Sequence, residues 1–179
     1  MSFRKEMVLF GKHGAEKWNV SDGAWDKLVN LLTPVVELAK NSDITLVVET
    51  GNNAMITSCF LGRKLIDDLN TEHLKVLWDP ANALYCGENP SKNALDSMEG
   101  GYLGHVHMKD VEVSIHQATI ECVALGRGQM SPHLQAISDR LNAIGYDGSM
   151  SLESVYRPSD GDFEDGFNAS IEKFKNLYS

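Results

Sequence analysis

Short, almost continuously apolar segments alternate along the chain with longer segments in which apolar residues recur every three or four positions. The short segments cover residues 7–10, 44–48, 74–78, 103–108 and 149–152. Continuous apolarity over so few residues is typical of strands that are covered on both faces, as in a parallel sheet. The pattern therefore predicts five parallel strands.

The longer segments have the spacing of amphipathic helices. We expect helices over residues 24–40, 57–69, 91–98, 132–144 and 164–178. Ser131 and Pro132 suit the N-cap and the first position of the fourth helix. Pro34 lies inside the first helix and predicts a kink there, or a division into two shorter helices. Strands that alternate with helices define an α/β domain over residues 1–179, either an open doubly wound sheet or a (β/α) barrel.

Composition narrows the range of partners and of compartments. The chain has a formal net charge of −9 and no basic run, which disfavours nucleic acid as a ligand. It has no apolar stretch long enough to span a membrane, and its first residues lack the apolar core of a secretory signal. The 3 cysteines are far apart and odd in number, as expected of reduced thiols. We therefore expect a cytoplasmic protein that binds neither nucleic acid nor membranes.

Chemistry-bearing side chains follow four of the five predicted strands. Glu49, Asp79 and Glu153 each come directly after a strand, and His107 lies near the end of the segment 103–108. One such carboxylate is usually a strand end that faces solvent. Four such groups after four separate strands predict a shared site, because the carboxyl ends of barrel strands all meet at one mouth.

Two glutamates, one aspartate and one imidazole form an oxygen-rich ligand set. Such a set is typical of sites for Mn²⁺, Mg²⁺ or Co²⁺ and differs from the thiolate ligands of a structural zinc site. Without a cation, converging carboxylates would repel one another and their pKa values would rise, so the residues themselves imply a metal ion. His105 lies two positions before His107 and points to the same side of the strand. It is either a hydrogen-bond partner at the site or a structural residue of the barrel interior.

A series of motifs occurs in a fixed order along the chain. They read VETG at 48–51, WDPANA at 78–83, GENP at 87–90, HVHMKD at 105–110, GRGQ at 126–129, GYDG at 145–148 and SLE at 151–153. In this order they resemble the sugar phosphate isomerase/epimerase family, the xylose isomerase-like TIM barrels that also include endonuclease IV. The resemblance extends from about residue 7 to the C-terminus.

The resemblance implies a ligand set and a reaction. Glu49, Asp79, His107 and Glu153 then occupy the metal-ligand positions, with Mn²⁺ expected first and Mg²⁺, Co²⁺ or Zn²⁺ as alternatives. Glu49 and Glu153 also occupy the positions of an acid/base pair for 1,2-proton transfer on a ketose or ketose phosphate through a cis-enediolate. Asn82 completes an Asp-x-x-Asn segment that resembles pentulose-phosphate 3-epimerases.

Further residues are expected to contact a small sugar or sugar phosphate. This group of expected substrate-binding residues consists of Asn82, His105, Lys109, Arg127 and Arg157. Asn82 does not titrate, so it either hydrogen-bonds the substrate or supports the site. Lys109, Arg127 and Arg157 are candidates for binding anionic groups, and Arg127 is equally well explained as an exposed loop residue.

The chain departs from the family in length. A (β/α)8 barrel needs eight strands at roughly 30 residues per unit, whereas this chain supplies five parallel βα units that match strands 4–8 of an incomplete TIM barrel. We expect a truncated chain, or one completed by another copy (a homo-oligomer) or by a complementing N-terminal half.

Two alternative functions remain open. One is a catalytically incomplete half-barrel stabilised by self-association.

The other alternative is a different metal-dependent enzyme on the same scaffold, either a dehydratase or an endonuclease IV-like enzyme. Residues 111–125 contain His116 but no Asp-x-His segment, which argues against DNA repair.

Overall fold

The computed structural model describes residues 6–7, 21–51, 54–114, 116–117, 119–153 and 155–178. Its main sheet has four parallel strands in the order β2-β3-β4-β7. These strands are β2 (Leu46–Glu49), β3 (Leu74–Trp78), β4 (Leu103–Met108) and β7 (Met150–Leu152). Each strand pairs in parallel with the next of these four along the chain, as in the wall of a barrel. The prediction of an α/β fold built as a partial TIM barrel is confirmed.

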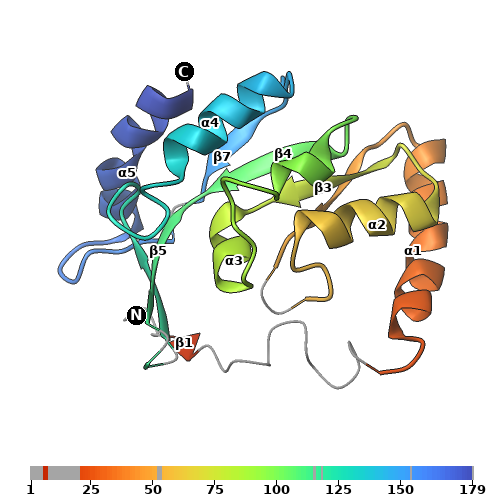
Figure 1. The fold of residues 1–179 in the computed structure, drawn as a ribbon, viewed down its shortest axis with the longest axis horizontal. Coiled ribbons are helices and arrows are strands. Elements are labelled where there is room, and N and C mark those ends of the chain that lie inside the picture. The colour runs from red at the N-terminus through yellow and green to blue at the C-terminus, as the bar shows by residue number, and fades with distance from the viewer. Residues whose placement is uncertain are drawn as a thin grey trace.

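Helices cover one face of this sheet. They are α1 (Ala24–Asn41), α2 (Cys59–Leu69), α3 (Pro80–Tyr85), the 3₁₀ helix η1 (Leu95–Met98), α4 (Leu134–Ala143) and α5 (Phe163–Tyr178). Helix α2 packs against β3 and α1 packs against α2, while α5 packs against β7 and α4 packs against α5 (Figure 1). Within the described ranges, no helix is both long and apolar enough to span a membrane.

The alternation of side chains along β3 separates the covered face from the open one. Val76 and Trp78 are fully buried, whereas Lys75 and Leu77, which point the other way, are half-buried. The α2 helix approaches Val76 closely at Gly62, where an added Cβ atom would lie 2.7 Å from a Val76 methyl group. The face of the sheet opposite α2 is therefore the one whose side chains are available for a functional site.

A β-hairpin that the sequence analysis did not predict extends beyond β4 (Figure 1). Its strands are β5 (Asp110–Ser114) and β6 (Thr119–Val123), and the short β1 (Glu6–Met7) pairs antiparallel with β6. The expected first parallel strand, 7–10, lies outside the described residues except for Met7. Met7 pairs antiparallel with Thr119, so it does not belong to the parallel sheet.

The helices differ from the sequence-based expectations at their ends. Pro34 does not divide α1, which is continuous from Ala24 to Asn41. The carbonyl that loses its partner belongs to the exposed Asn30, where water can replace the missing bond. Helix α4 begins at Leu134, two positions later than expected, and its N-cap is His133. The segment 91–98 forms only η1, and the six-residue α3 was not predicted.

Candidate metal centre

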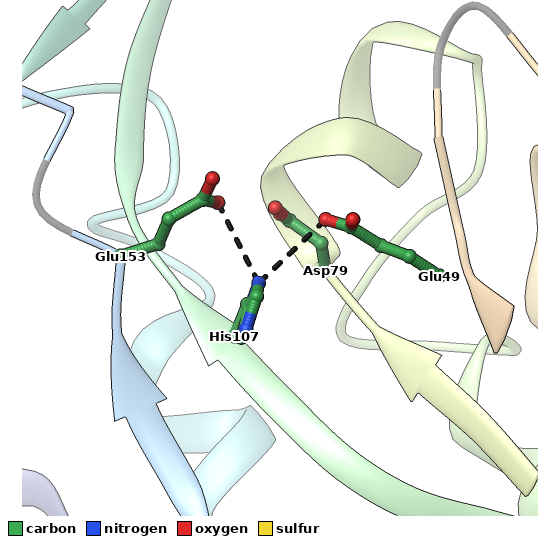
Figure 2. A group of neighbouring side chains, drawn as sticks. All are labelled: Glu49, Asp79, His107 and Glu153. Atoms are coloured by element: carbon green, nitrogen blue, oxygen red, sulfur yellow. Dashed lines mark ion pairs between the residues drawn. The ribbon is translucent and has the colours of Figure 1, made fainter. Parts of the chain in front are cut away.

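Four side chains converge at the carboxyl end of the parallel sheet. Glu49 ends β2, Asp79 follows β3, His107 lies in β4, and Glu153 follows β7. One ligand atom from each residue lies within 4.8 Å of the others (Figure 2). The strands are neighbours in the sheet and run in the same direction, so their ends place these groups side by side. The structure thus brings together the four residues that the sequence analysis selected as ligands.

The His107 imidazole faces the two glutamates without hydrogen-bonding to them. Its Nδ1 atom lies 3.6 Å from Glu49 Oε1 and 3.8 Å from Glu153 Oε2, distances that are too long for hydrogen bonds. Within the described part of the chain, Nδ1 is buried and has no hydrogen-bond partner. A buried ring nitrogen that lacks a hydrogen-bond partner and is directed at carboxylate oxygens is suited to share a cation with them. The donor set therefore fits a divalent metal ion.

Asp79 divides its two carboxylate oxygens between a helix and the site. Its Oδ1 atom accepts hydrogen bonds from the backbone N–H groups of Ala81 and Asn82, both at 3.0 Å, and so caps α3. Pro80 suits the first helical position because it has no N–H group to satisfy. The other oxygen, Oδ2, faces the Lys109 ammonium group.

Lys109 supplies a positive charge inside the cluster. Its Nζ atom donates to Asp79 Oδ2 at 2.5 Å and to Glu153 Oε2 at 2.6 Å, and the residue is only 8% exposed. From the sequence, the repulsion between the converging carboxylates was expected to be offset by a metal ion. The structure corrects this point, because Lys109 offsets part of their charge.

The two carboxyl groups that contact Lys109 have pKa values shifted in opposite directions. Burial raises the pKa of Asp79, although the Lys109 ammonium and the Asn82 backbone N–H oppose that shift. Burial also acts to raise the pKa of Glu153, but the Lys109 charge and hydrogen bond outweigh it and lower the pKa overall. The pKa of Asp79 is therefore raised, as expected from the sequence, but mainly by burial rather than by repulsion between carboxylates, and the pKa of Glu153 is lowered, contrary to the expectation.

Asn82 and Thr50 connect the ends of β2 and β3. Asn82 is buried, and its Nδ2 atom donates to the Thr50 carbonyl at 3.0 Å and lies 3.5 Å from Glu49 Oε1. The Thr50 hydroxyl accepts a hydrogen bond from the Asp79 backbone N–H at 2.9 Å. Sequence reasoning gave Thr50 no role. Its position directly after Glu49 was the available signal.

His105 points to the same side of β4 as His107, as its spacing predicted. The two imidazole rings are perpendicular, with centroids 5.2 Å apart. The ring nitrogens of His105 contact two hydroxyl groups, that of Ser149 at 3.0 Å and that of Ser151 at 2.5 Å. Burial, followed by the neighbouring His107, lowers the pKa of His105. His105 therefore packs beneath the cluster, and the two serines are contacts that the sequence analysis did not identify.

The two arginines named from the sequence lie outside the four-residue cluster. Arg127 is exposed in the loop after β6, and Arg157 donates from Nε to the Gly161 carbonyl at 2.8 Å. The loop that carries Arg127 is held by Asp110, a buried residue that sequence reasoning did not identify. The Asp110 carboxylate accepts hydrogen bonds from the backbone N–H groups of Val111, Gly126, Gly128 and Met130.

A parallel barrel wall with a carboxylate and histidine cluster at the carboxyl ends of its strands defines a class of α/β-barrel proteins with a candidate metal centre. A family model described as "Xylose isomerase-like TIM barrel" matches residues 3–177 of the chain. The chain therefore belongs to this family, as its motifs indicated.

Solved structures share the fold at low sequence identity. An L-ribulose 3-epimerase structure has a TM-score of 0.70 and 20% identity, and the match covers 88% of this chain and 55% of the other. A xylose isomerase domain protein from Planctomyces limnophilus has a TM-score of 0.70 and 24% identity, covering 88% of this chain and 53% of the other. The IOLI protein with a bound zinc atom has a TM-score of 0.68 and 16% identity, covering 86% and 56%.

The chain thus spans about half the length of these proteins. No curated protein matches it.

Proposed function

We propose that this chain carries the metal-binding and acid–base residues of a sugar isomerase or epimerase. The reaction would be a 1,2-proton transfer on a ketose or ketose phosphate. The observation that supports the proposal is the convergence of Glu49, Asp79, His107 and Glu153 within 4.8 Å at one end of a barrel wall. The similarity of the fold to an L-ribulose 3-epimerase supports the same class of substrate.

Glu49, Asp79, His107 and Glu153 would hold the divalent ion. Three carboxylates and one imidazole favour Mn²⁺, with Mg²⁺, Co²⁺ and Zn²⁺ as the alternatives. When bound, such an ion supplies the positive charge that stabilises an enediolate anion of the substrate. The Nδ1 atom of His107, which has no hydrogen-bond partner among the described residues, is the feature that best supports this assignment.

Glu49 and Glu153 would act as the acid/base pair. They come from the two outer strands of the sheet and lie on opposite sides of His107 (Figure 2). A substrate held between them would present one face of its reacting carbon to each carboxylate. One glutamate removes the proton beside the carbonyl and the other returns a proton to the opposite face, which inverts that centre.

Substrate contacts are assigned to the residues around this pair. We assign His105 and Asn82 to the floor and side of the site, where both already support the ligand residues. Lys109, Arg127 and Arg157 would neutralise anionic groups of the substrate or of the site. Of these three, Lys109 is bonded directly to two residues of the cluster.

The remaining wall of the barrel would come from outside the described strands. Among the described residues, β2 and β7 each pair with one neighbour in the parallel sheet, so each offers a free edge. We propose that another copy of the chain or a complementing N-terminal half closes this wall. Within the described part of the chain, Cys59 and Cys86 form no disulfide, which supports a cytoplasmic location.

The proposal is tested by proton exchange into the substrate. The full chain, in its assembled state and with Mn²⁺, is incubated with pentulose phosphates and free pentuloses in D₂O, and deuterium incorporation and epimer formation are followed by NMR. Glu49→Gln and Glu153→Gln should each reduce exchange by about 100-fold or more, because each removes one proton carrier. Glu72→Gln, at an exposed turn, is the matched control and should retain full exchange.

Three outcomes would overturn the proposal. They are no exchange by the metal-loaded assembly, full exchange in Glu153→Gln, and a loss of exchange in Glu72→Gln equal to that in the site variants. Elimination of water from the substrate would instead identify a dehydratase on the same scaffold.

A further inference from the structure

We infer that Lys109 is an internal counter-cation of the candidate metal centre, which holds Asp79 and Glu153 in the metal-free protein and competes with a divalent ion for them. The inference rests on the metal site of the proposed function and adds a residue that regulates metal loading. It concerns the binding of the metal, not the reaction on the sugar.

The contacts of Lys109 are made to the oxygens that a metal ion would use. Oδ1 of Asp79 is committed to the N-terminus of α3 through Ala81 and Asn82, so Oδ2 is the oxygen that remains for the site. Lys109 Nζ lies 2.5 Å from that oxygen. It also lies 2.6 Å from Glu153 Oε2, the same atom that lies 3.8 Å from His107 Nδ1.

The position of Lys109 in the chain explains this placement. His105, His107 and Lys109 alternate along one segment, so all three side chains point to the open face of the sheet. The Lys109 side chain is 9% exposed, and a charge that is this well buried requires partners. Asp79, with a fully buried side chain, requires a counter-charge for the same reason.

The Lys109 ammonium group and a divalent ion cannot both contact the same two carboxylate oxygens without repelling each other. A divalent ion that contacts Asp79 Oδ2 and Glu153 Oε2 meets the Lys109 charge at close range and repels it. The ammonium group must then give up at least one of its two carboxylates. Lys109 therefore stabilises the metal-free site and weakens the affinity of the site for the metal.

A purely structural ion pair makes different predictions. If Lys109 only holds the fold, its loss reduces stability and leaves metal affinity unchanged. If Lys109 positions the carboxylates for the metal, its loss weakens metal binding. Competition alone predicts that metal binding becomes tighter while the metal-free protein becomes less stable.

The test is calorimetric titration of the full chain with Mn²⁺ alone, together with thermal unfolding of the metal-free protein. Lys109→Met and Lys109→Gln should each bind Mn²⁺ about tenfold more tightly or better, because the competing charge is gone. Both metal-free variants should melt at lower temperature than the parent chain. Lys109→Arg, which keeps the charge, should bind Mn²⁺ within about threefold of the parent.

Lys75→Met is the matched control. Lys75 lies on the open face of the sheet, as Lys109 does, but it donates a hydrogen bond to the Gly101 carbonyl rather than to the cluster. Its Mn²⁺ affinity should equal that of the parent chain. Unchanged or weaker Mn²⁺ binding in the Lys109→Met and Lys109→Gln variants would overturn the inference, as would an equal gain in Lys75→Met.

A second measurement does not depend on a variant that folds. The ¹⁵N-detected ammonium signal of Lys109 in the parent chain should shift when diamagnetic Mg²⁺ is added, and an unchanged signal at saturating Mg²⁺ contradicts the competition. Failure of the proposed sugar chemistry leaves these results intact, since neither measurement contains a sugar. Absence of metal binding in the parent chain and in every variant would overturn the inference together with the metal site.

Discussion

Asn82 donates a hydrogen bond from its side-chain amide to the carbonyl oxygen of Thr50, with 3.0 Å between the two atoms. The bond joins the start of α3 to the end of β2, two segments that are 32 positions apart in the chain. The same amide nitrogen lies 3.5 Å from Glu49 Oε1. The position of the Glu49 carboxylate therefore depends on a neutral side chain from the neighbouring βα unit.

Removal of this amide should destabilise the protein. Asn82→Ala leaves the buried Thr50 carbonyl without this donor, and we expect the free energy of unfolding to fall by about 1–3 kcal/mol in urea titrations. Asn93→Ala, at an exposed position, is the control and should change it by less than about 0.5 kcal/mol. Equal stability of the two variants would show that the bond does not hold the strand ends together.

Mn²⁺ should stabilise the chain through His107. An ion that binds only the folded state at a concentration of about 100 times its Kd adds about 2.7 kcal/mol to the free energy of unfolding. We expect the melting temperature to rise with Mn²⁺, to fall again with EDTA, and to remain unchanged by either in His107→Ala. His116→Ala, in the exposed turn of the hairpin, should respond like the parent chain. An undiminished response in His107→Ala would exclude that imidazole as a ligand.

Glu88 should make stability depend on pH. Its carboxylate oxygens lie 3.3 Å and 3.4 Å from the Cys59 backbone nitrogen, whose N–H group donates to them, and burial raises the pKa of Glu88 to about 7 from an ordinary value of 4.5. The folded state thus binds a proton that the unfolded state releases. This contribution to stability is fully present below about pH 4.5 and is lost as the pH rises through about 7.

The variant Glu88→Gln removes this titration while keeping an acceptor for the Cys59 N–H group. Relative to the parent chain, we expect it to be more stable by about 1–2 kcal/mol at about pH 8, a value reduced because the carboxylate is partly exposed. The gain should shrink as the pH approaches about 5. Denaturant titrations at several pH values measure the difference, and a variant that is less stable than the parent at about pH 8 would refute the assignment.

Asp110 should be essential to the loop after β6. It is 1% exposed and accepts four backbone N–H groups, whereas the amide of Asn has only one oxygen that can accept. We expect Asp110→Asn to lower the free energy of unfolding by about 2–4 kcal/mol, since buried donors lose their partner. Asp96→Asn, in an exposed pair with Arg140, should cost less than about 1 kcal/mol in the same unfolding experiment.

The parallel sheet and the cluster could be predicted from the sequence because both depend on local patterns. Apolar runs mark buried strands, and Glu49, Asp79 and Glu153 directly follow such runs. The direction of the strands then determines that these side chains meet. The spacing of His105 and His107 likewise indicated one shared face, and in the structure Lys109 reaches the same cluster.

Other features depend on tertiary partners that no local pattern reveals. Val111 and Val113 alternate with polar residues over too short a segment to indicate a hairpin, and β6 becomes a strand by pairing with them. The start of α3 is fixed by the cap that Asp79 provides, a residue whose sequence context pointed only to the site. Lys109 pairs with Asp79 and Glu153 because these side chains are buried together, and the sequence alone does not show which side chains are buried together.

The dual role of Asp79 constrains how this chain can evolve. Asn, Ser and Thr begin helices about as well as Asp does, so drift among these four residue types is normally tolerated at such a position. Here only an aspartate gives one oxygen to the first turn of α3 and a second, charged oxygen to the opposite side. A neutral replacement would preserve the cap of α3 and yet remove one charged oxygen from the candidate metal centre, so Asp79 is more restricted in residue type than its capping role alone requires.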